Sequence, residues 1–68
     1  DCENALLSTK SAIRMQPNNQ NFRLMQARVL RICGDPERAI EILSSLTPSQ
    51  VVRDEIELCK EIKVNHEH

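Results

Sequence analysis

The sequence predicts an all-α protein of about four helices that fold as antiparallel hairpins. Apolar side chains recur at spacings of three and four residues, which is the period of a helix face and not of a strand. The chain is 40% hydrophobic with Phe22 as its single aromatic residue, so the core is aliphatic and suits closely packed helices. Breaks of two or three residues divide the chain and force consecutive helices to run antiparallel. These breaks are Pro17-Asn18-Asn19, Gly34-Asp35-Pro36 and Thr47-Pro48-Ser49.

The first two helices are expected at 2–16 and 20–33. Pro17 ends the first, because the residue before a proline is pushed away from α geometry. An Asn pair can cap the second, and Gly34 suits a left-handed terminus. The first helix has one inward stripe, and the wide apolar face of the second predicts packing against two partners. The stripes are Cys2, Ala5, Leu6, Thr9, Ala12 and Ile13 on the first, and Phe22, Met25, Val29, Ile32 and Cys33 with Ala27 and Leu30 on the second.

The last two helices are expected at 36–46 and 48–64, followed by a frayed tail at 65–68. Asp35 caps the third, with Pro36 in its first turn. Thr47 is expected to cap the fourth, with Gln50 completing a capping box. The inward residues are Ala39, Ile40, Leu43 and Leu46, then Val52, Ile56, Cys59 and Ile62, with Arg53, Asp54, Glu57, Lys60 and Glu61 facing outward.

An internal repeat is visible when the chain is shifted by 34 residues. Asp1-Cys2-Glu3-Asn4-Ala5-Leu6 then aligns with Asp35-Pro36-Glu37-Arg38-Ala39-Ile40, and Ala12 aligns with Leu46. The segment PNNQNFRLMQARVLRICGDPERAIEIL, residues 17–43, resembles a tetratricopeptide repeat of a divergent, aromatic-poor type. The resemblance runs from residue 1 to about residue 46. It rests on Pro17, Ala27, Leu30, the Gly34-Asp35 turn and Ala39.

The chain departs from the family pattern at three points. Arg23 and Gln26 stand where the family favours Trp and Leu. Pro48 comes before the position at which the family's closing proline is usual. The resemblance implies a right-handed repeat fragment: 1–19 as the second helix of a preceding repeat, 20–47 as one repeat, and 48–64 as a terminal capping helix. It implies that small or apolar residues pack the hairpins, namely Ala5, Ala12, Ala27, Leu30, Gly34 and Ala39.

In the family, one stripe of the first repeat helix lines a concave groove that binds peptides. The corresponding stripe here is spaced three, four and three residues apart and consists of Asn21, Leu24, Arg28 and Arg31. We expect an acidic-apolar protein segment as the ligand, and a solvated basic face is the alternative. The family's chaperone-tail clamp uses Lys and Asn where Leu24 and Arg28 stand, which disfavours that ligand.

Composition bears on the other classes of function. A net charge of −1 argues against a dedicated nucleic-acid binder, although Arg23, Arg28, Arg31 and Arg38 leave a small helix-turn-helix reader as an alternative. No apolar run reaches the roughly 18 residues of a membrane span. Three widely spaced cysteines predict unpaired thiols and a reducing, cytoplasmic location, with Cys33 and Cys59 buried in the core.

No catalytic motif, cofactor signature or metal site is expected. Cys59, His66, Glu67 and His68 lack the tight pairs of ligands that structural zinc requires. The sequence therefore predicts a protein-interaction or scaffold segment of a longer repeat protein and not an enzyme. An accessory or assembly domain attached to an oxidoreductase or chaperone is the second reading. We also expect self-association through helix 2–16, whose missing hairpin partner leaves its stripe uncovered.

Overall fold

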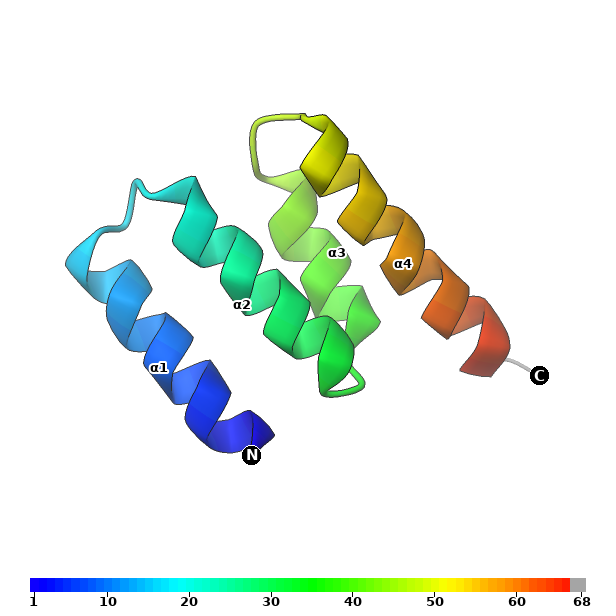
Figure 1. Cartoon of the computed structure of the whole chain (residues 1–68), viewed down its shortest axis with the longest axis horizontal. Helices are drawn as coiled ribbons and strands as arrows, with labels where there is room; N and C mark the ends of the chain where they lie inside the picture. Colours follow the sequence, from blue (N-terminus) through cyan, green and yellow to red (C-terminus); the bar gives the residue numbers. More distant parts are fainter. Residues whose placement is uncertain (67–68) are drawn as a thin grey trace.

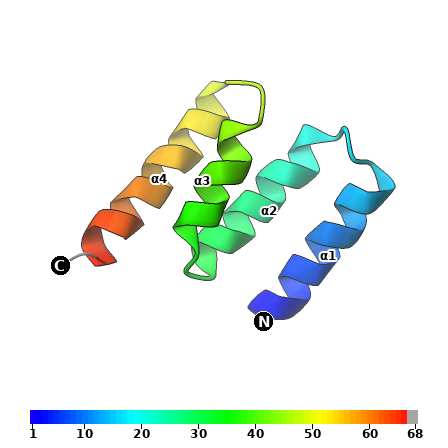
Figure 2. The same cartoon turned by 180° about the vertical axis from the view of Figure 1, so that it is seen from behind.

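The computed structural model describes residues 1–66, which form four helices and no strand. They are α1 (Cys2–Met15), α2 (Gln20–Ile32), α3 (Pro36–Ser44) and α4 (Gln50–His66). The predicted helices are confirmed, with every boundary within two residues of its expected position. The chain reverses at each connection, and α3 lies behind and between α2 and α4 (Figure 1; seen from behind in Figure 2). Residues 65 and 66 continue α4, while the rest of the predicted tail lies outside the described residues.

The first two connections use the predicted capping residues. The Asn19 side chain accepts a hydrogen bond from the Asn21 N–H at 2.9 Å, and the Asp35 side chain caps α3. Gly34 has a φ of 92°, and the N–H of Asp35 donates to the Leu30 carbonyl at 2.8 Å. This is the Schellman arrangement, which satisfies the last carbonyls of α2 and needs a residue that tolerates positive φ.

The third connection differs from the expectation. Thr47 does not cap α4, because its hydroxyl and its N–H are both bonded to the Gln20 side chain. Ser49 takes this role instead: its Oγ accepts from the Val52 N–H at 3.3 Å, and its carbonyl accepts from the Arg53 N–H at 3.0 Å. The α3–α4 connection is therefore longer than predicted, and α4 begins two residues later.

The fully buried hydrophobic residues come from α2, α3, α4 and the α3–α4 connection. Ala27 and Ala39 are 1% and 0% exposed, as expected for small residues between packed helices. The cluster consists of Ala27, Leu30, Ala39, Leu43, Leu46, Val52 and Cys59. Helix α1 adds half-buried Leu6 to its edge, together with buried Thr9, whose hydroxyl donates to the Leu6 carbonyl at 2.9 Å. Ala5 and Ala12 are half-buried.

Part of the predicted inward face of α2 is exposed. Phe22 and Val29 are half-buried, but Met25 is 50% exposed and Ile32 is 73% exposed. Within residues 1–66, α1 contacts α2 alone, so one helix covers only part of that wide face. The apolar stripe of α2 therefore has an open edge.

The prediction of unpaired cysteines was wrong for Cys2 and Cys33. Cys2 and Cys33 form a disulfide with a Cα–Cα distance of 5.7 Å, and only Cys59 is both free and buried. Cys2 and Cys33 are equally far in sequence from the Pro17-Asn18 turn. The antiparallel hairpin therefore brings the two thiols together at its open end. This pairing removes the observation on which the expectation of a reducing compartment rested.

Close packing of the alanines leads to a test of the core. Ala39→Leu should lower the free energy of unfolding by roughly 1–3 kcal/mol, because a larger side chain overpacks the contact between α2 and α3. Ala27→Leu should behave in the same way. Chemical denaturation followed by circular dichroism measures the change.

Ser44→Leu is the matched control, since Ser44 is exposed on the same helix as Ala39 and should shift stability by at most about 0.5 kcal/mol. Equal stability of Ala39→Leu and the wild type would contradict a close helix approach at that position.

Candidate functional site

Helices α2 and α4 run side by side in the same direction and contact each other directly (Figure 1). Gln20 of α2 is bonded to Thr47 in the connection that leads into α4, and Arg28 of α2 is bonded to Glu55 of α4. Both pairs link residues 27 positions apart, and Arg31 is bonded to Glu55 as well. A constant separation means that the two elements stay in register between the pairs. The surface between them is therefore a continuous strip from the start of both helices to their middle.

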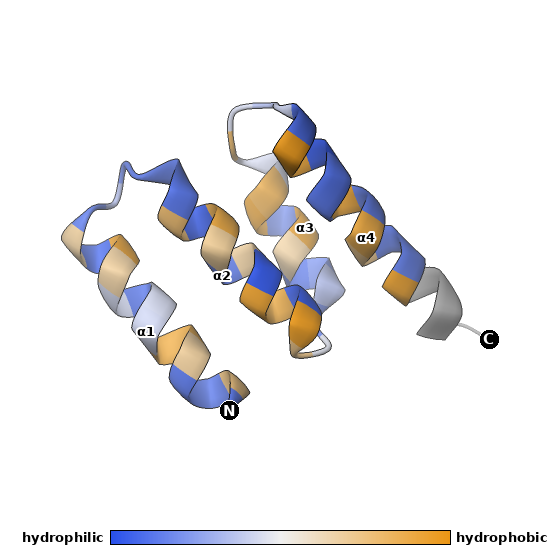
Figure 3. Ribbon diagram, in the orientation of Figure 1, coloured by the Kyte–Doolittle hydropathy of each residue, from blue (hydrophilic) through white to orange (hydrophobic). Residues whose placement is uncertain are grey.

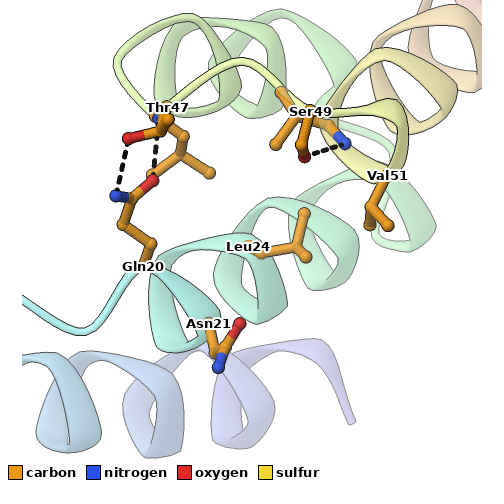
Figure 4. Close-up of a pocket in the computed structure, with 8 residues that line it drawn as sticks. Gln20, Asn21, Leu24, Thr47, Ser49 and Val51 are labelled. Carbon is orange, nitrogen blue, oxygen red and sulfur yellow. Dashed lines mark hydrogen bonds between the residues drawn. The ribbon is translucent and has the colours of Figure 1, made fainter.

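The upper end of this strip is closed by an amide side chain. Gln20 donates from Nε2 to the Thr47 hydroxyl at 2.8 Å and accepts from the Thr47 N–H at its Oε1 at 2.7 Å (Figure 4). This two-point contact ties the α3–α4 connection to the first turn of α2. It also satisfies one backbone donor of a segment outside any helix.

A cavity of about 350 Å³ lies next to this contact. Leu24 and Val51 point toward the space between the two helices, with Asn21 and Ser49 at its edge (Figure 4). An apolar lining with a few polar groups is typical of a site that takes an apolar side chain. The lining residues are Gln20, Asn21, Leu24, Leu46, Thr47, Ser49, Val51 and Val52.

One turn further along both helices, two arginines share one carboxylate. The Nε atoms of Arg28 and Arg31 each donate to a different oxygen of Glu55, both at 3.0 Å. The Glu55 side chain is only 8% exposed, whereas that of Arg28 is 49% exposed. A buried carboxylate needs such partners, because an unpaired charge would be costly to remove from water. The three side chains together carry one net positive charge.

The four residues predicted for the partner-binding stripe are thereby divided into two groups. Asn21 and Leu24 line the cavity, while Arg28 and Arg31 bind Glu55. The arginines were expected to be free for a ligand, and their Nε atoms are not. Among the side chains that the structure describes, residues 1–62, only their Nε atoms are engaged in hydrogen bonds, and the terminal guanidinium nitrogens are able to donate.

Sequence reasoning missed Glu55 although a signal was present. Glu55 follows Val52 by three residues and precedes Cys59 by four, so it lies on the same buried stripe of α4. An acidic residue on an apolar stripe requires a partner from a facing element. Arg28 and Arg31 on the predicted stripe of α2 supply it.

Exposed apolar side chains flank this arginine cluster on both helices. Met25 and Ile32 are exposed on α2, and Val51 and Leu58 are exposed on α4. Asn21, Met25, Arg28 and Ile32 follow one another at four, three and four residues and are all exposed, so they form one open stripe. Hydrophobic and hydrophilic segments accordingly alternate along both ribbons (Figure 3).

The Cys59 thiol on α4 is buried, and its titration is perturbed. Burial raises the pKa of the Cys59 thiol above its ordinary value of 9.0, Arg31 lowers it in part, and Glu55 adds to the increase. The thiol therefore stays protonated at neutral pH and packs as a small apolar group.

In the part of the chain that the structure describes, no three acidic, His or Cys side chains are grouped to hold a metal ion. The side chain of His66, together with Glu67 and His68, lies outside that part.

Removing the Glu55 charge tests the electrostatic contact. In Glu55→Gln, one guanidinium keeps an acceptor while the other faces an amide donor, and both charges lose their counterion. We expect the free energy of unfolding to fall by about 1–3 kcal/mol in a denaturation experiment. Glu57→Gln on the exposed side of α4 is the matched control, with an expected change within about 0.5 kcal/mol. Equal effects of the two variants would show that the shared carboxylate contributes nothing to stability.

The raised pKa of Cys59 links stability to alkaline pH. The folded state holds the thiol proton to higher pH than the unfolded chain does. The contribution of Cys59 is therefore complete below about pH 9.0 and is lost as the pH rises toward the folded-state pKa. The stability of the wild type relative to Cys59→Ala should decline as the pH rises from about 9.0 toward the folded-state pKa, in denaturation curves recorded without reductant. A pH-independent difference would contradict the raised pKa.

Comparisons place no known protein beside this chain: no family model, no curated protein and no solved structure matches it. Among residues 1–66, no helix is both long and apolar enough to cross a membrane.

Proposed function

We propose that this chain is a protein-binding module of the tetratricopeptide-like type, and that it takes an acidic-apolar segment of its partner between α2 and α4. The observation that carries this proposal is the combination of an apolar cavity with an adjacent, partly exposed arginine cluster. The exposed side chains Met25, Ile32, Val51 and Leu58 extend the apolar surface on both sides. A surface of this kind is typical of a binding site.

The arrangement of the helices supports the repeat assignment within this proposal. Helices α1 and α3 run in one direction and α2 and α4 in the other, so the chain alternates two kinds of helix (Figure 1). When the sequence is shifted by 34 residues, the first turn of α1 aligns with the first turn of α3. The Arg28–Glu55 contact between α2 and α4 is offset by 27 residues and not by 34; α3 has only nine residues, and α4 starts 30 residues after α2.

Ligand charge follows from the arginine cluster. Glu55 holds the two Nε atoms, so the outer nitrogens of Arg28 and Arg31 are preoriented at little further entropic cost. The cluster carries one net positive charge, which one ligand carboxylate would neutralise. A guanidinium can donate two parallel hydrogen bonds to such a carboxylate. The alternative of a helix-turn-helix nucleic-acid binder relies on four arginines. Two of them bind Glu55, which does not favour that alternative.

A defined pair of peptides tests this function. One is a helical 14-residue peptide with leucines at helical spacing around a central Glu, and the other has Lys in place of that Glu. The Glu peptide should bind at least about tenfold more tightly, since the Lys peptide places a like charge next to the guanidinium cluster. Binding is measured by isothermal titration, and the site is located from NMR shifts of Leu24, Val51 and Leu58.

The variant Arg28→Gln should abolish the preference for Glu, whereas Arg53→Gln on the exposed side of α4 should retain it. Raising the salt from 50 mM to 0.5 M should weaken binding of the Glu peptide several-fold, because half-exposed charges are screened. Equal affinity for both peptides, or shifts confined to α1 and α3, would contradict the proposed site.

A further inference from the structure

Helix α1 packs against a single other helix, whereas each of the other described helices packs against two or three. Within residues 1–66 it contacts α2 alone, whereas α2, α3 and α4 all contact one another. The fully buried apolar cluster lies in the part from Ala27 to Cys59, and α1 adds only half-buried Leu6. Its single buried residue is Thr9, whose hydroxyl is satisfied within α1 itself. Noncovalent packing on α1 is therefore limited and one-sided.

A covalent bond compensates at one end of α1. Cys2 lies in the first turn of α1, and Cys33 is the C-cap of α2, so the disulfide joins the open end of the hairpin. The opposite end is closed by the turn that follows Gln16. The disulfide closes a loop of 31 residues, and this restricts how far α1 can separate from α2.

Solvent has access to this bond. Cys2 is exposed and Cys33 is half-buried, in contrast to fully buried Cys59. A cavity of about 200 Å³ opens beside the bond, lined by Asp1, Cys2, Ala5, Val29, Ile32 and Cys33. A thiol reagent can therefore approach a sulfur atom without prior unfolding of the core, which is the condition for site-selective exchange.

We propose that the Cys2–Cys33 disulfide is a redox-controlled latch, and that its reduction by a dithiol releases α1 while α2, α3 and α4 stay folded. One thiolate of the dithiol attacks a sulfur of the pair, the S–S bond breaks, and the other cysteine leaves as a thiolate and takes up a proton. The second reagent thiolate then attacks the mixed disulfide and releases the remaining cysteine. Two electrons pass to the protein, and the dithiol becomes a cyclic disulfide.

Release of α1 uncovers the side of α2 that it covers. Phe22, the only aromatic residue of the chain, and Val29 are half-buried there and become accessible next to exposed Met25 and Ile32. The stripe Ala5, Leu6 and Ile13 of α1 is uncovered at the same time. Reduction thus converts a partly covered apolar surface into an open one on the α1 side of α2, and exposed Met25 and Ile32 lie between this surface and Arg28.

Hydrogen exchange of the oxidised and reduced protein tests the latch. Backbone amides of α1, such as those of Leu6 to Ala12, should exchange between about tenfold and a few hundredfold faster after addition of a dithiol, as expected for loss of a loop of this length. Amides of Leu43 and Val52 to Cys59 should change by less than about twofold. The double variant Cys2→Ser/Cys33→Ser should show the fast α1 rates with or without reductant.

Cys59→Ala is the matched control, since it removes the other cysteine and leaves the disulfide intact; its α1 amides should respond to the dithiol as those of the wild type do. Mass spectrometry after alkylation should count one free thiol before reduction and three after it. Three thiols in the oxidised protein, unchanged α1 exchange on reduction, or equal acceleration in α1 and α4 would each overturn the proposal.

Discussion

Helix α2 packs against three different helices at once, and the arrangement of the described structure depends on these contacts. Within residues 1–66 it is the one helix that contacts all the others. Each contact uses a different interaction: a disulfide at Cys33 toward α1, the small side chain of Ala27 in the core with α3, and two arginines toward α4. A helix has room for three such stripes, because its side chains project in all directions around the axis.

The three contacts differ in how they respond to the surroundings. The core between α2 and α3 depends on apolar burial and close packing, which neither salt nor mild reductant removes. The contact with α4 includes an ion cluster with a half-exposed arginine, so it is sensitive to ligand charge and ionic strength. The contact with α1 includes a disulfide bond, which breaks under reducing conditions. The proposed binding site and the proposed latch thus use different faces of one helix, with Met25 and Ile32 exposed between them.

A chain this small has a limited apolar core, and the polar contacts supplement it. The Glu55 carboxylate, the Gln20 amide and the disulfide each join segments that are distant in sequence. Gln20, Thr47 and Cys2 are exposed, whereas Glu55 is buried on the apolar stripe of α4. The carboxylate, amide and disulfide contacts also set the register of the hairpins, since each requires a particular pair of residues to face each other.

Much of the local structure could be predicted from residues close together in the sequence. Pro17 and Gly34 ended two helices where expected, and Asn19 and Asp35 capped the helices that follow, because capping and chain reversal depend on neighbouring residues. The inward positions Ala27, Ala39, Leu43 and Cys59 were also recognisable from helical spacing. Thr47 was misread, because its real partner Gln20 lies in another helix and offers more hydrogen bonds than a cap would.

By itself the sequence determined four helices, their order, the turns between them and most of the buried positions, since these follow from periodicity and turn chemistry. Which side chains meet across helices was decided by the tertiary structure alone. The pairing of Cys2 with Cys33, the sharing of Glu55 by Arg28 and Arg31, and the open edge at Met25 and Ile32 all depend on how the helices are rotated and offset. Rotation and offset result from packing the whole set of side chains at once, which no single stretch of sequence specifies.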